Sequence, residues 1–427
     1  MFAADALLLA ALTFNAESPG EAVALVHAGC ARCAWGETGR EAATLTLSLD
    51  GTYSQHLVLV RGESPAEYRI TLGTVAAGRH ELTVDRDPTL SAINVGDVSI
   101  DVPIVAVLPP GSDDSVAQSM APILYARPNT IGRFTDLPIL MWYEVAPTPR
   151  GRRFRYSVIF TNEDGGTETD RLMATWGRTT DIEFVYGVEL DHAGQVLAEE
   201  FQGPGHEVPP FKGRHEARHP LLWVSTDNNM VSESGTTSVR YAPAPERFDL
   251  TNVSREAVMD RHPWSYTVAF EEARREGKIA DKPPGQNAIP DPRRFVFVEA
   301  CGEIGNAALA FAVTLGRAPI RPGRVVPWIW SDRGVERYRI VRDGCFRAAI
   351  PLPRRVRPRE VIALRAFAYK RPPTYGRAVA PVNPVRLTRV NTVFMLDDMY
   401  QPGPPMLTWT GDVRLEPGGR PFDLPIK

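Results

Sequence analysis

The sequence lacks the long apolar runs and short motifs that mark membrane proteins, nucleotide-binding enzymes and serine hydrolases. No apolar run reaches the roughly 18–20 residues that span a bilayer, so no transmembrane segment is predicted. The formal net charge of −3 gives no strong electrostatic case for binding nucleic acid. There is no P-loop, no G-x-G-x-x-G phrase and no G-x-S-x-G elbow, so neither a nucleotide cofactor nor a nucleophilic serine is predicted.

Cysteine is also scarce, with four residues in a chain of 427. Cys30 lies close to Cys33, and Cys301 lies in the same region as Cys345. This spacing is compatible with two disulfides and an oxidising compartment, and also with free thiols. His27-x-x-Cys30-x-x-Cys33 holds three possible zinc ligands, but no second pair is nearby. A loop disulfide or ordinary thiols are therefore favoured over zinc.

The first residues leave the exported form open. Ala6–Leu12 resembles the short apolar core of a signal peptide, but Asp5 precedes it in place of Lys or Arg, and no clean A-x-A site follows. The alternative is that Ala6–Phe14 is the first strand of the first domain. The predicted location is extracellular or the cell envelope, with residues 1–16 either a cleaved signal or part of the fold.

Turn-forming residues, by contrast, are abundant. The 38 prolines and 34 glycines are spread along the chain between short apolar runs, which favours an all-β chain. A length of 427 residues corresponds to roughly two to four domains. The predicted fold is mostly β, a multi-domain β-sandwich architecture with a short helical segment after the central sandwich.

Three domains are predicted. Residues 1–112 form an N-terminal β-sandwich accessory domain, residues 118–290 a central β-sandwich domain with the helix, and residues 291–427 a C-terminal β-sandwich domain. Segments 109–114 and 282–292 are rich in Pro, Gly and polar residues and are the expected linkers.

Turn and cap signals mark individual elements within these domains. Asp50-Gly51 joins two alternating runs as a hairpin turn does. Pro263–Gly277 is the predicted helix, because proline suits the first turn and glycine suits the residue after the last turn. The expected strands are Ala43–Leu49, Gln55–Val60, Tyr68–Leu72, His80–Val84, Ile139–Val145, Phe154–Thr161, Ile182–Leu190, Val196–Phe201, Leu221–Ser225, Arg294–Ala300, Ala307–Leu315, Val325–Trp330, Tyr338–Val341, Phe346–Leu352, Val361–Tyr369 and Val385–Met395.

The stretch 176–207 holds the main candidate site. Because side chains alternate along a strand, Asp181 and Glu183 are expected on the same face. Two adjacent carboxylates repel unless they are solvated, paired with an arginine such as Arg178, or share a cation. Ca²⁺, Mg²⁺ and Mn²⁺ prefer oxygen ligands of this type. His206 follows in a loop whose flanking glycines permit close approach of the backbone.

Five phrases of the central region follow the order of a known family. They are Ala121–Pro128, Arg155–Phe160, Thr179–Val185, Gln202–His206 and His219–Met230. In order and spacing they resemble the Vps62-like family and, more remotely, the NLP-type necrosis-inducing cytolysins, over about residues 120–235. The resemblance implies that the central β-sandwich belongs to this type.

The resemblance also implies a divalent-cation site. In the cytolysins, the Asp and Glu of the core phrase and a nearby His help to hold a divalent cation. Asp181, Glu183 and His206 would have that role here, and Asp227 and the two asparagines after it could supply further oxygens. The metal ligands expected from the resemblance are Asp181, Glu183, His206 and Asp227, with Ca²⁺, Mg²⁺ or Mn²⁺ as the cation.

This chain departs from the family pattern at three places. Thr179 and Thr180 stand near the position of the family's first histidine. Ile182 replaces a tryptophan, and Asp227 with the two asparagines that follow it replaces a second Gly-Ser-His. The expected cation site therefore has one histidine fewer than the family's site.

A second group of polar residues lies in the loop after this stretch. His206, His215 and His219, with Glu207 and Glu216, could form an acid/base cluster. Because Lys and Arg residues are interspersed among them, a polar loop is the alternative.

Two tryptophans form a third candidate. Trp328 and Trp330 alternate on one expected strand, as the residues of sugar-stacking platforms do. Burial of one ring and exposure of the other is the commoner arrangement.

The predicted function is a binding or interaction protein of the envelope or exterior. A divalent cation in the central sandwich would engage a glycan or a lipid headgroup. The alternative is a hydrolase of glycosides or phosphoesters, with Asp181 and Glu183 as acid/base groups or metal ligands. A third possibility is a structural surface protein in which the acidic pair is inert.

Overall fold

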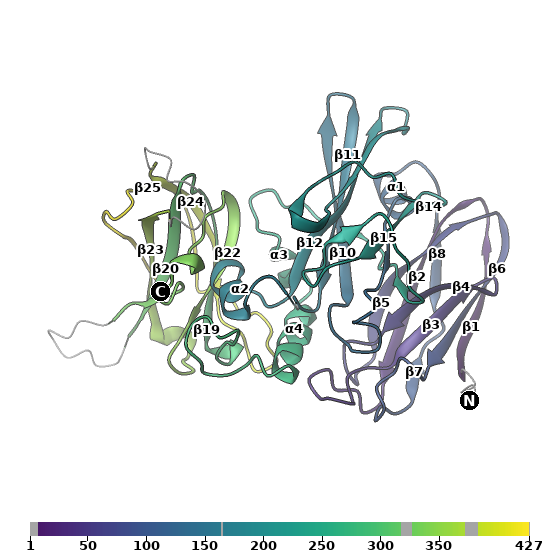
Figure 1. The fold of residues 1–427 in the computed structure, drawn as a ribbon, viewed down its shortest axis with the longest axis horizontal. Helices are drawn as coiled ribbons and strands as arrows, with labels where there is room; N and C mark the ends of the chain where they lie inside the picture. Colours follow the sequence, from purple (N-terminus) through teal and green to yellow (C-terminus); the bar gives the residue numbers. More distant parts are fainter. Residues whose placement is uncertain (1–6, 164, 317–326, 372–382, 427) are drawn as a thin grey trace. The chain divides into compact units, whose positions relative to one another are not determined.

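The chain folds into two compact units, seen in the computed structural model of Figure 1. The structure describes residues 7–163, 165–316, 327–371 and 383–426. The first unit contains Met1–Gly166 and Thr180–Asp249, and the second contains Thr167–Thr179 and Leu250–Lys427. One short segment thus leaves the first unit and joins the second before the chain returns.

The first unit opens with a pair of antiparallel sheets. One sheet has the strand order β1-β6-β3-β4, and the other has the order β5-β2-β7 with β8 beside β2. Leu45 and Leu47 of β3 and Leu82 and Val84 of β6 are fully buried, so these alternate positions form the core face. The strands are β1 Leu7–Ala16, β2 Gly20–Cys30, β3 Thr44–Leu49, β4 Thr52–Val58, β5 Ala66–Val75, β6 Gly78–Asp87, β7 Val98–Ile100 and β8 Ile104–Leu108.

A second pair of sheets completes the first unit. The five strands of one sheet run in the order β13-β12-β11-β10-β18, and the other sheet has the order β14-β15-β9-β17 with β16 beside β15. Tyr156 and Val188 from the first of these sheets and Leu222 from the second share one apolar core. The strands are β9 Ile123–Tyr125, β10 Pro138–Thr148, β11 Gly151–Phe160, β12 Asp181–Asp191, β13 Val196–Phe201, β14 His215–Glu216, β15 His219–Val224, β16 Val231–Ser232, β17 Arg240–Tyr241 and β18 Glu246–Arg247.

A short helix, α1 (Asp113–Ser119), connects the two pairs of sheets in sequence. The hydroxyl of Ser112 caps it by accepting a hydrogen bond from the backbone N–H of Ser115. The hydroxyl of Ser115 in turn accepts a hydrogen bond from the backbone N–H of Ser112. This capping box satisfies backbone groups that would otherwise lack partners. The expected linker 109–114 therefore ends in the first turn of a helix.

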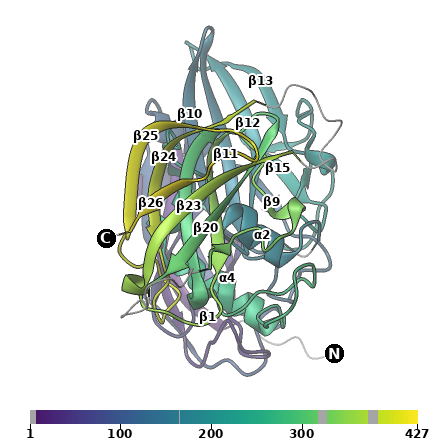
Figure 2. The same cartoon turned by 90° about the vertical axis from the view of Figure 1, so that its left-hand side faces the viewer.

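The second unit is a sandwich of two four-stranded sheets. Their orders are β22-β19-β24-β25 and β21-β20-β23-β26, and Figure 2 faces the second of them, with β20, β23 and β26 side by side. Phe311, Phe346 and Leu387 lie in the apolar core between the sheets. The strands are β19 Phe295–Glu303, β20 Ala307–Leu315, β21 Ile329–Trp330, β22 Gly344–Pro351, β23 Val361–Lys370, β24 Val385–Phe394, β25 Leu407–Leu415 and β26 Phe422–Pro425.

The α-helices of the second unit within the described residues are α2 (Thr169–Trp176), α3 (Ala257–Arg261) and α4 (Trp264–Arg275). Helix α4 confirms the predicted helix, with Pro263 at its N-cap. Gly277 follows its C-cap residue with a φ of 71°, the left-handed conformation that glycine adopts without strain.

The expected strand Val325–Trp330 is a strand only over Ile329–Trp330, and residues 325–326 lie outside the described residues. The predicted strand Tyr338–Val341 was wrong. Of the expected strand Tyr338–Val341, the first residue ends a 3₁₀ turn, Glu336–Tyr338, and Ile340 forms only an isolated bridge with Leu309. The Tyr338 hydroxyl donates to Asp170 of α2 at 2.7 Å. This contact with a residue far away in sequence holds the segment in a turn.

The fold class is as predicted, a mostly β, multi-domain β-sandwich protein. The two units do not test the expected boundaries at 112, 118 and 290, which stay predictions. Within the part of the chain that the structure describes, no helix is both long and apolar enough to cross a membrane.

Candidate functional site

Asp181 begins β12 inside a buried polar cluster of the first unit. Its Oδ2 accepts a hydrogen bond from Asn229 Nδ2 at 3.1 Å. The same amide group lies 3.3 Å from Asp136 Oδ1 and 3.1 Å from the carbonyl oxygen of Asn162. All four residues are buried. Asp181 is therefore neither on a solvated face nor aimed at solvent.

An arginine completes this cluster. The guanidinium of Arg127 is 5% exposed and contacts the carboxylates of both Asp136 and Asp227. Asp136 is fully buried, whereas the Asp227 side chain is 65% exposed. The protein thus places a positive charge of its own among the carboxylates that were expected to hold a cation. Sequence reasoning did not identify Arg127 or Asp136, although Arg127 lies within one of the five phrases.

Glu183 and His206 have different contacts. Glu183 accepts from the side-chain amide of Gln202, whose nitrogen also lies 3.4 Å from the sulfur of Met230. His206 is exposed in the 3₁₀ turn Pro204–His206. Among the described residues, no group of three or more His, Cys, Asp and Glu side chains is placed to hold a metal. The four-ligand cation site accordingly stays a prediction.

Arg178, the arginine expected to pair with the acidic residues of the candidate site, contacts Glu256. Its Nε lies 3.1 Å from Glu256 Oε1 in the second unit, and both side chains are buried. Burial alone would raise the pKa of the Glu256 carboxyl, but Arg178 and the neighbouring arginines outweigh it and hold the pKa below its ordinary value.

Two of the three loop histidines, His215 and His219, have separate carboxylate partners. His215 Nε2 lies 2.8 Å from Glu199 Oε1, and His219 is buried between Glu21 Oε1 at 2.9 Å and the carbonyl oxygen of Ala121 at 2.8 Å. An ionised Glu21 and a backbone carbonyl both accept hydrogen bonds, so this arrangement favours the imidazolium form of His219, in which both ring nitrogens donate. Burial would lower the pKa of His219, but the bond and charge of Glu21 outweigh it and raise the pKa. These residues therefore form structural ion pairs.

Both expected cysteine pairs are disulfides. Cys30 is bonded to Cys33, and Cys301 is bonded to Cys345 across neighbouring strands β19 and β22. His27 pairs with Asp101 at 2.6 Å. The zinc alternative at His27 is excluded in this state, because a disulfide offers no thiolate.

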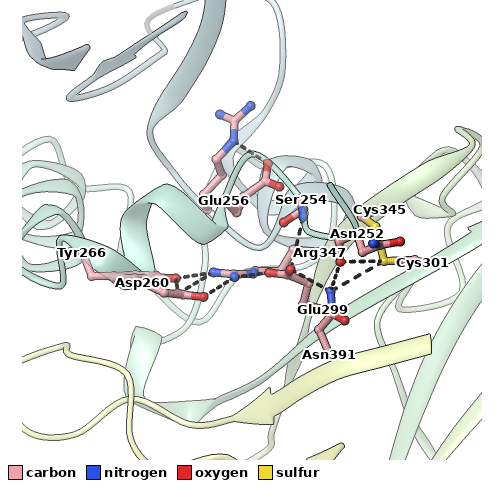
Figure 3. A network of polar contacts seen from close by, with 11 residues as sticks. Asn252, Ser254, Glu256, Asp260, Tyr266, Glu299, Cys301, Cys345, Arg347 and Asn391 are labelled. Atoms are coloured by element: carbon pink, nitrogen blue, oxygen red, sulfur yellow. Dashed lines mark hydrogen bonds and ion pairs between the residues drawn. A yellow bond between two sulfur atoms is a disulfide. The ribbon is translucent and has the colours of Figure 1, made fainter. Parts of the chain in front are cut away.

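The second unit contains a buried ionic network, drawn in Figure 3. Arg347 of β22 is fully buried and pairs with Asp260 of α3 at 2.5 Å and with Glu299 of β19. It also contacts the hydroxyl of Tyr266 on α4, which donates to Asp260 at 2.6 Å. The network ties both helices to the sheet.

An open groove of about 580 Å³ lies on the second unit. Trp330 of β21 forms part of its wall, together with the other uncharged lining residues, Pro283, Pro290, Ile329, Gly334, Pro351, Leu352 and Pro353. Charged side chains surround this apolar surface: Asp281, Lys282, Arg294 and Arg333. A concave surface that combines an aromatic ring with a few polar groups is the usual form of a small-ligand site.

Trp328 and Trp330, the two tryptophans identified from the sequence, differ in how accessible their rings are to a ligand. The guanidinium of Arg365 covers the ring of Trp328 at 3.9 Å from its centroid, and Asp423 holds that guanidinium at 2.7 Å. Trp330 packs edge-on against Phe367 and Tyr369, with ring centroids 6.0 and 6.3 Å away. These contacts orient Trp330 in the groove wall, where it is partly exposed. Trp330 is therefore the available platform.

The remaining groove residues were not found from sequence. Segment 281–283 fell at the edge of an expected linker, and its approach to Arg294 and Arg333 depends on how the chain folds back. Arg294 is fully engaged: it contacts Asp281 at 2.9 Å and donates to the carbonyl oxygens of Leu352 and Pro353. No local signal in the sequence marks these positions.

Comparison with known proteins gives distant structural likenesses. No family model matches the chain, and no curated protein matches it. The chain is similar to the solved structure "NLPPya in complex with mannosamine", with 12% identity, 33% of this chain and 75% of that chain covered, and a TM-score of 0.24. It is also similar to the M60 catalytic domain with the CBM51-1 and CBM51-2 domains from Clostridium perfringens ZmpB, with 10% identity and a TM-score of 0.15, over 79% of this chain and 33% of that one. The chain thus spans about a third of the second protein, and neither likeness at these scores bears on function.

Proposed function

We propose that the protein binds carbohydrate through the groove of its second unit. The observation that carries this proposal is the partly exposed ring of Trp330 in a groove of about 580 Å³ with a polar rim. A sugar presents an apolar face of C–H groups and an edge of hydroxyls. An aromatic wall with polar groups beside it complements both surfaces.

The groove supports binding better than hydrolysis. Glycosidases use a pair of carboxyl groups on either side of the scissile bond. Among the described residues that line the groove, Asp281 is the one carboxylate, and Arg294 contacts both of its oxygens. Asp181, at 1% exposure, is likewise too buried to meet a substrate directly. No contact of the described structure thus favours the hydrolase alternative.

This proposal keeps the glycan part of the predicted function and moves it to another unit. The divalent-cation site expected around Asp181 and Asp227 is a separate proposal, because those residues belong to the first unit. The proposed glycan binding in the groove requires no metal and depends on the side chain of Trp330.

The test compares the two tryptophans on one panel of immobilised polysaccharides. We expect wild-type protein to bind at least one polymer, and Trp330→Ala to weaken that binding at least about tenfold, as loss of an aromatic anchor does. Trp328→Ala is the matched control, since Arg365 already covers that ring. Trp330→Tyr should restore part of the affinity.

Circular dichroism and thermal unfolding of each variant establish that the fold survives. Absence of binding to every polymer, or equal binding by folded Trp330→Ala and wild-type protein, would overturn the proposal.

A further inference from the structure

We infer that the groove selects sugars that carry a negative charge, a carboxylate or a sulfate ester. This inference rests on the proposed carbohydrate function and adds the class of sugar. Its basis is the charge of the groove: three cationic side chains, Lys282, Arg294 and Arg333, face one carboxylate, Asp281. A cation that already pairs with a protein carboxylate has little charge left for a ligand, so the partners of each of the three side chains must be compared.

Arg294 is not available. Its Nη1 lies 2.9 Å from both oxygens of Asp281, and its Nε and Nη2 donate to the backbone carbonyls of Leu352 and Pro353. A guanidinium with every nitrogen engaged and its charge matched by a carboxylate has little left to offer a ligand. Arg294 and Asp281 together shape the groove and cancel in charge.

Lys282 is the available cation. Its side chain is exposed and forms no ion pair with any residue that the structure describes. Its backbone carbonyl accepts a hydrogen bond from Arg333 Nη2 at 2.9 Å, which holds Lys282 against another residue of the groove lining. The ammonium group therefore lies at the groove without an ion pair to any described residue, since Arg294 engages the neighbouring Asp281.

Arg333 retains part of its charge. Its Nη1 lies 4.0 Å from Asp170 Oδ2, a long separation for an ion pair. That carboxylate oxygen already accepts from the Tyr338 hydroxyl and the Gly285 backbone N–H, each at 2.7 Å. An acceptor so engaged neutralises the more distant guanidinium only weakly. The groove therefore keeps a net positive charge beside Trp330.

These features together fit an acidic sugar. The C–H face of the ring would stack on Trp330, and its carboxylate or sulfate would meet Lys282 and Arg333. Both acid groups are oxyanions, which accept hydrogen bonds from ammonium and guanidinium groups. A neutral sugar would stack on the tryptophan and accept hydrogen bonds through its hydroxyls, without the added attraction between opposite charges.

The experiment measures the affinity of the full chain for matched polymers by affinity electrophoresis and calorimetry. The neutral probes are dextran and xylan, the carboxylated probe is polygalacturonate, and the sulfated probe is dextran sulfate. We expect an acidic polymer to bind most tightly, with an affinity that falls as NaCl is raised because exposed charges are screened. Lys282→Gln should weaken that binding about fivefold, the effect of one charge pair near water. Lys370→Gln, an exposed lysine of the same unit outside the groove, is the control.

The possible results distinguish selection for charged sugars from carbohydrate binding itself. If neutral polymers bind as tightly as acidic ones, and Lys282→Gln matches wild type, the charge selection is overturned while carbohydrate binding stands. If acidic polymers bind but Trp330→Ala binds equally well, the polymers attach to the surface by charge alone and both ideas fail. A preference for polygalacturonate over dextran sulfate, or the reverse, identifies the acid group.

Discussion

Arg127 is the residue whose position says most about the first unit. Its 5% exposed guanidinium meets the fully buried carboxylate of Asp136, with Asp181 in the same hydrogen-bonded cluster through Asn229. Removing one partner of a buried ion pair leaves the other uncompensated, which costs about 3–5 kcal/mol. We therefore expect Arg127→Met to lower the free energy of unfolding, measured by urea denaturation, by that amount. Arg40→Met, which removes an exposed pair with Glu37, should cost about 1 kcal/mol or less.

Divalent cations give a second readout of this cluster. If Asp181 and Asp227 hold a cation as the family resemblance implies, Ca²⁺ or Mn²⁺ raises the Tm of the wild type and not that of Asp181→Asn. If Arg127 supplies the positive charge, added cations leave the wild-type Tm unchanged. Equal losses of stability in Arg127→Met and Arg40→Met would contradict the ionic role of Arg127.

His219 gives the first unit a pH dependence. Its pKa is raised above the ordinary 6.5, with Glu21 outweighing burial. A raised folded-state pKa stabilises the protein fully below the unfolded value, and this stabilisation is lost as the pH rises through the folded value. We expect the free energy of unfolding to fall with pH above about 6.5 by more in wild type than in Glu21→Gln, measured by denaturant titration at each pH. If the free energy of unfolding changes identically with pH in the two proteins, the pair of His219 and Glu21 does not contribute to stability.

At the scale of elements, the Arg347 network fastens α3 and α4 to the sheet of the second unit (Figure 3). Arg347→Met would leave Glu299 buried with one partner fewer, so we expect a loss of about 3–5 kcal/mol in urea denaturation. Arg386 is the matched control, because it also lies between two carboxylates, Glu303 and Asp412, but all three are exposed. Arg386→Met should cost about 1 kcal/mol or less. A similar loss in both variants would mean that burial does not set the strength of these pairs.

The elements also show where sequence patterns suffice. Helix α4 was predictable because its stop signal is local: Gly277 has the left-handed backbone that only a residue without a Cβ adopts freely. Tyr338 was misassigned because its partner, Asp170, lies in a different helix far along the chain. The need for glycine at position 177 also depends on a residue far away in sequence, because a Cβ there would lie 2.7 Å from the Cγ of Arg347. Local signals predict element type, and distant contacts override them.

At the scale of the whole molecule, the pairs of sheets agree with the sequence prediction, and the two disulfides decide between alternatives that the cysteine spacing left open. Evenly spread prolines and glycines restrict the chain to short strands, and alternating apolar residues require two layers to bury them. The crossing of Thr167–Thr179 into the second unit was not predictable, because it depends on how α2 packs and not on any composition change. The sequence therefore predicts the architecture but not which segments share a unit.

The sequence by itself determined the fold class and most of the strands, because both follow from periodicity and turn spacing along the chain. Only the tertiary structure decided the site. It placed Arg127 among the expected cation ligands, covered Trp328 with Arg365, and left Trp330 in a groove with Lys282. The physical reason is that availability depends on which neighbours cover or neutralise a side chain, and those neighbours come from distant parts of the chain.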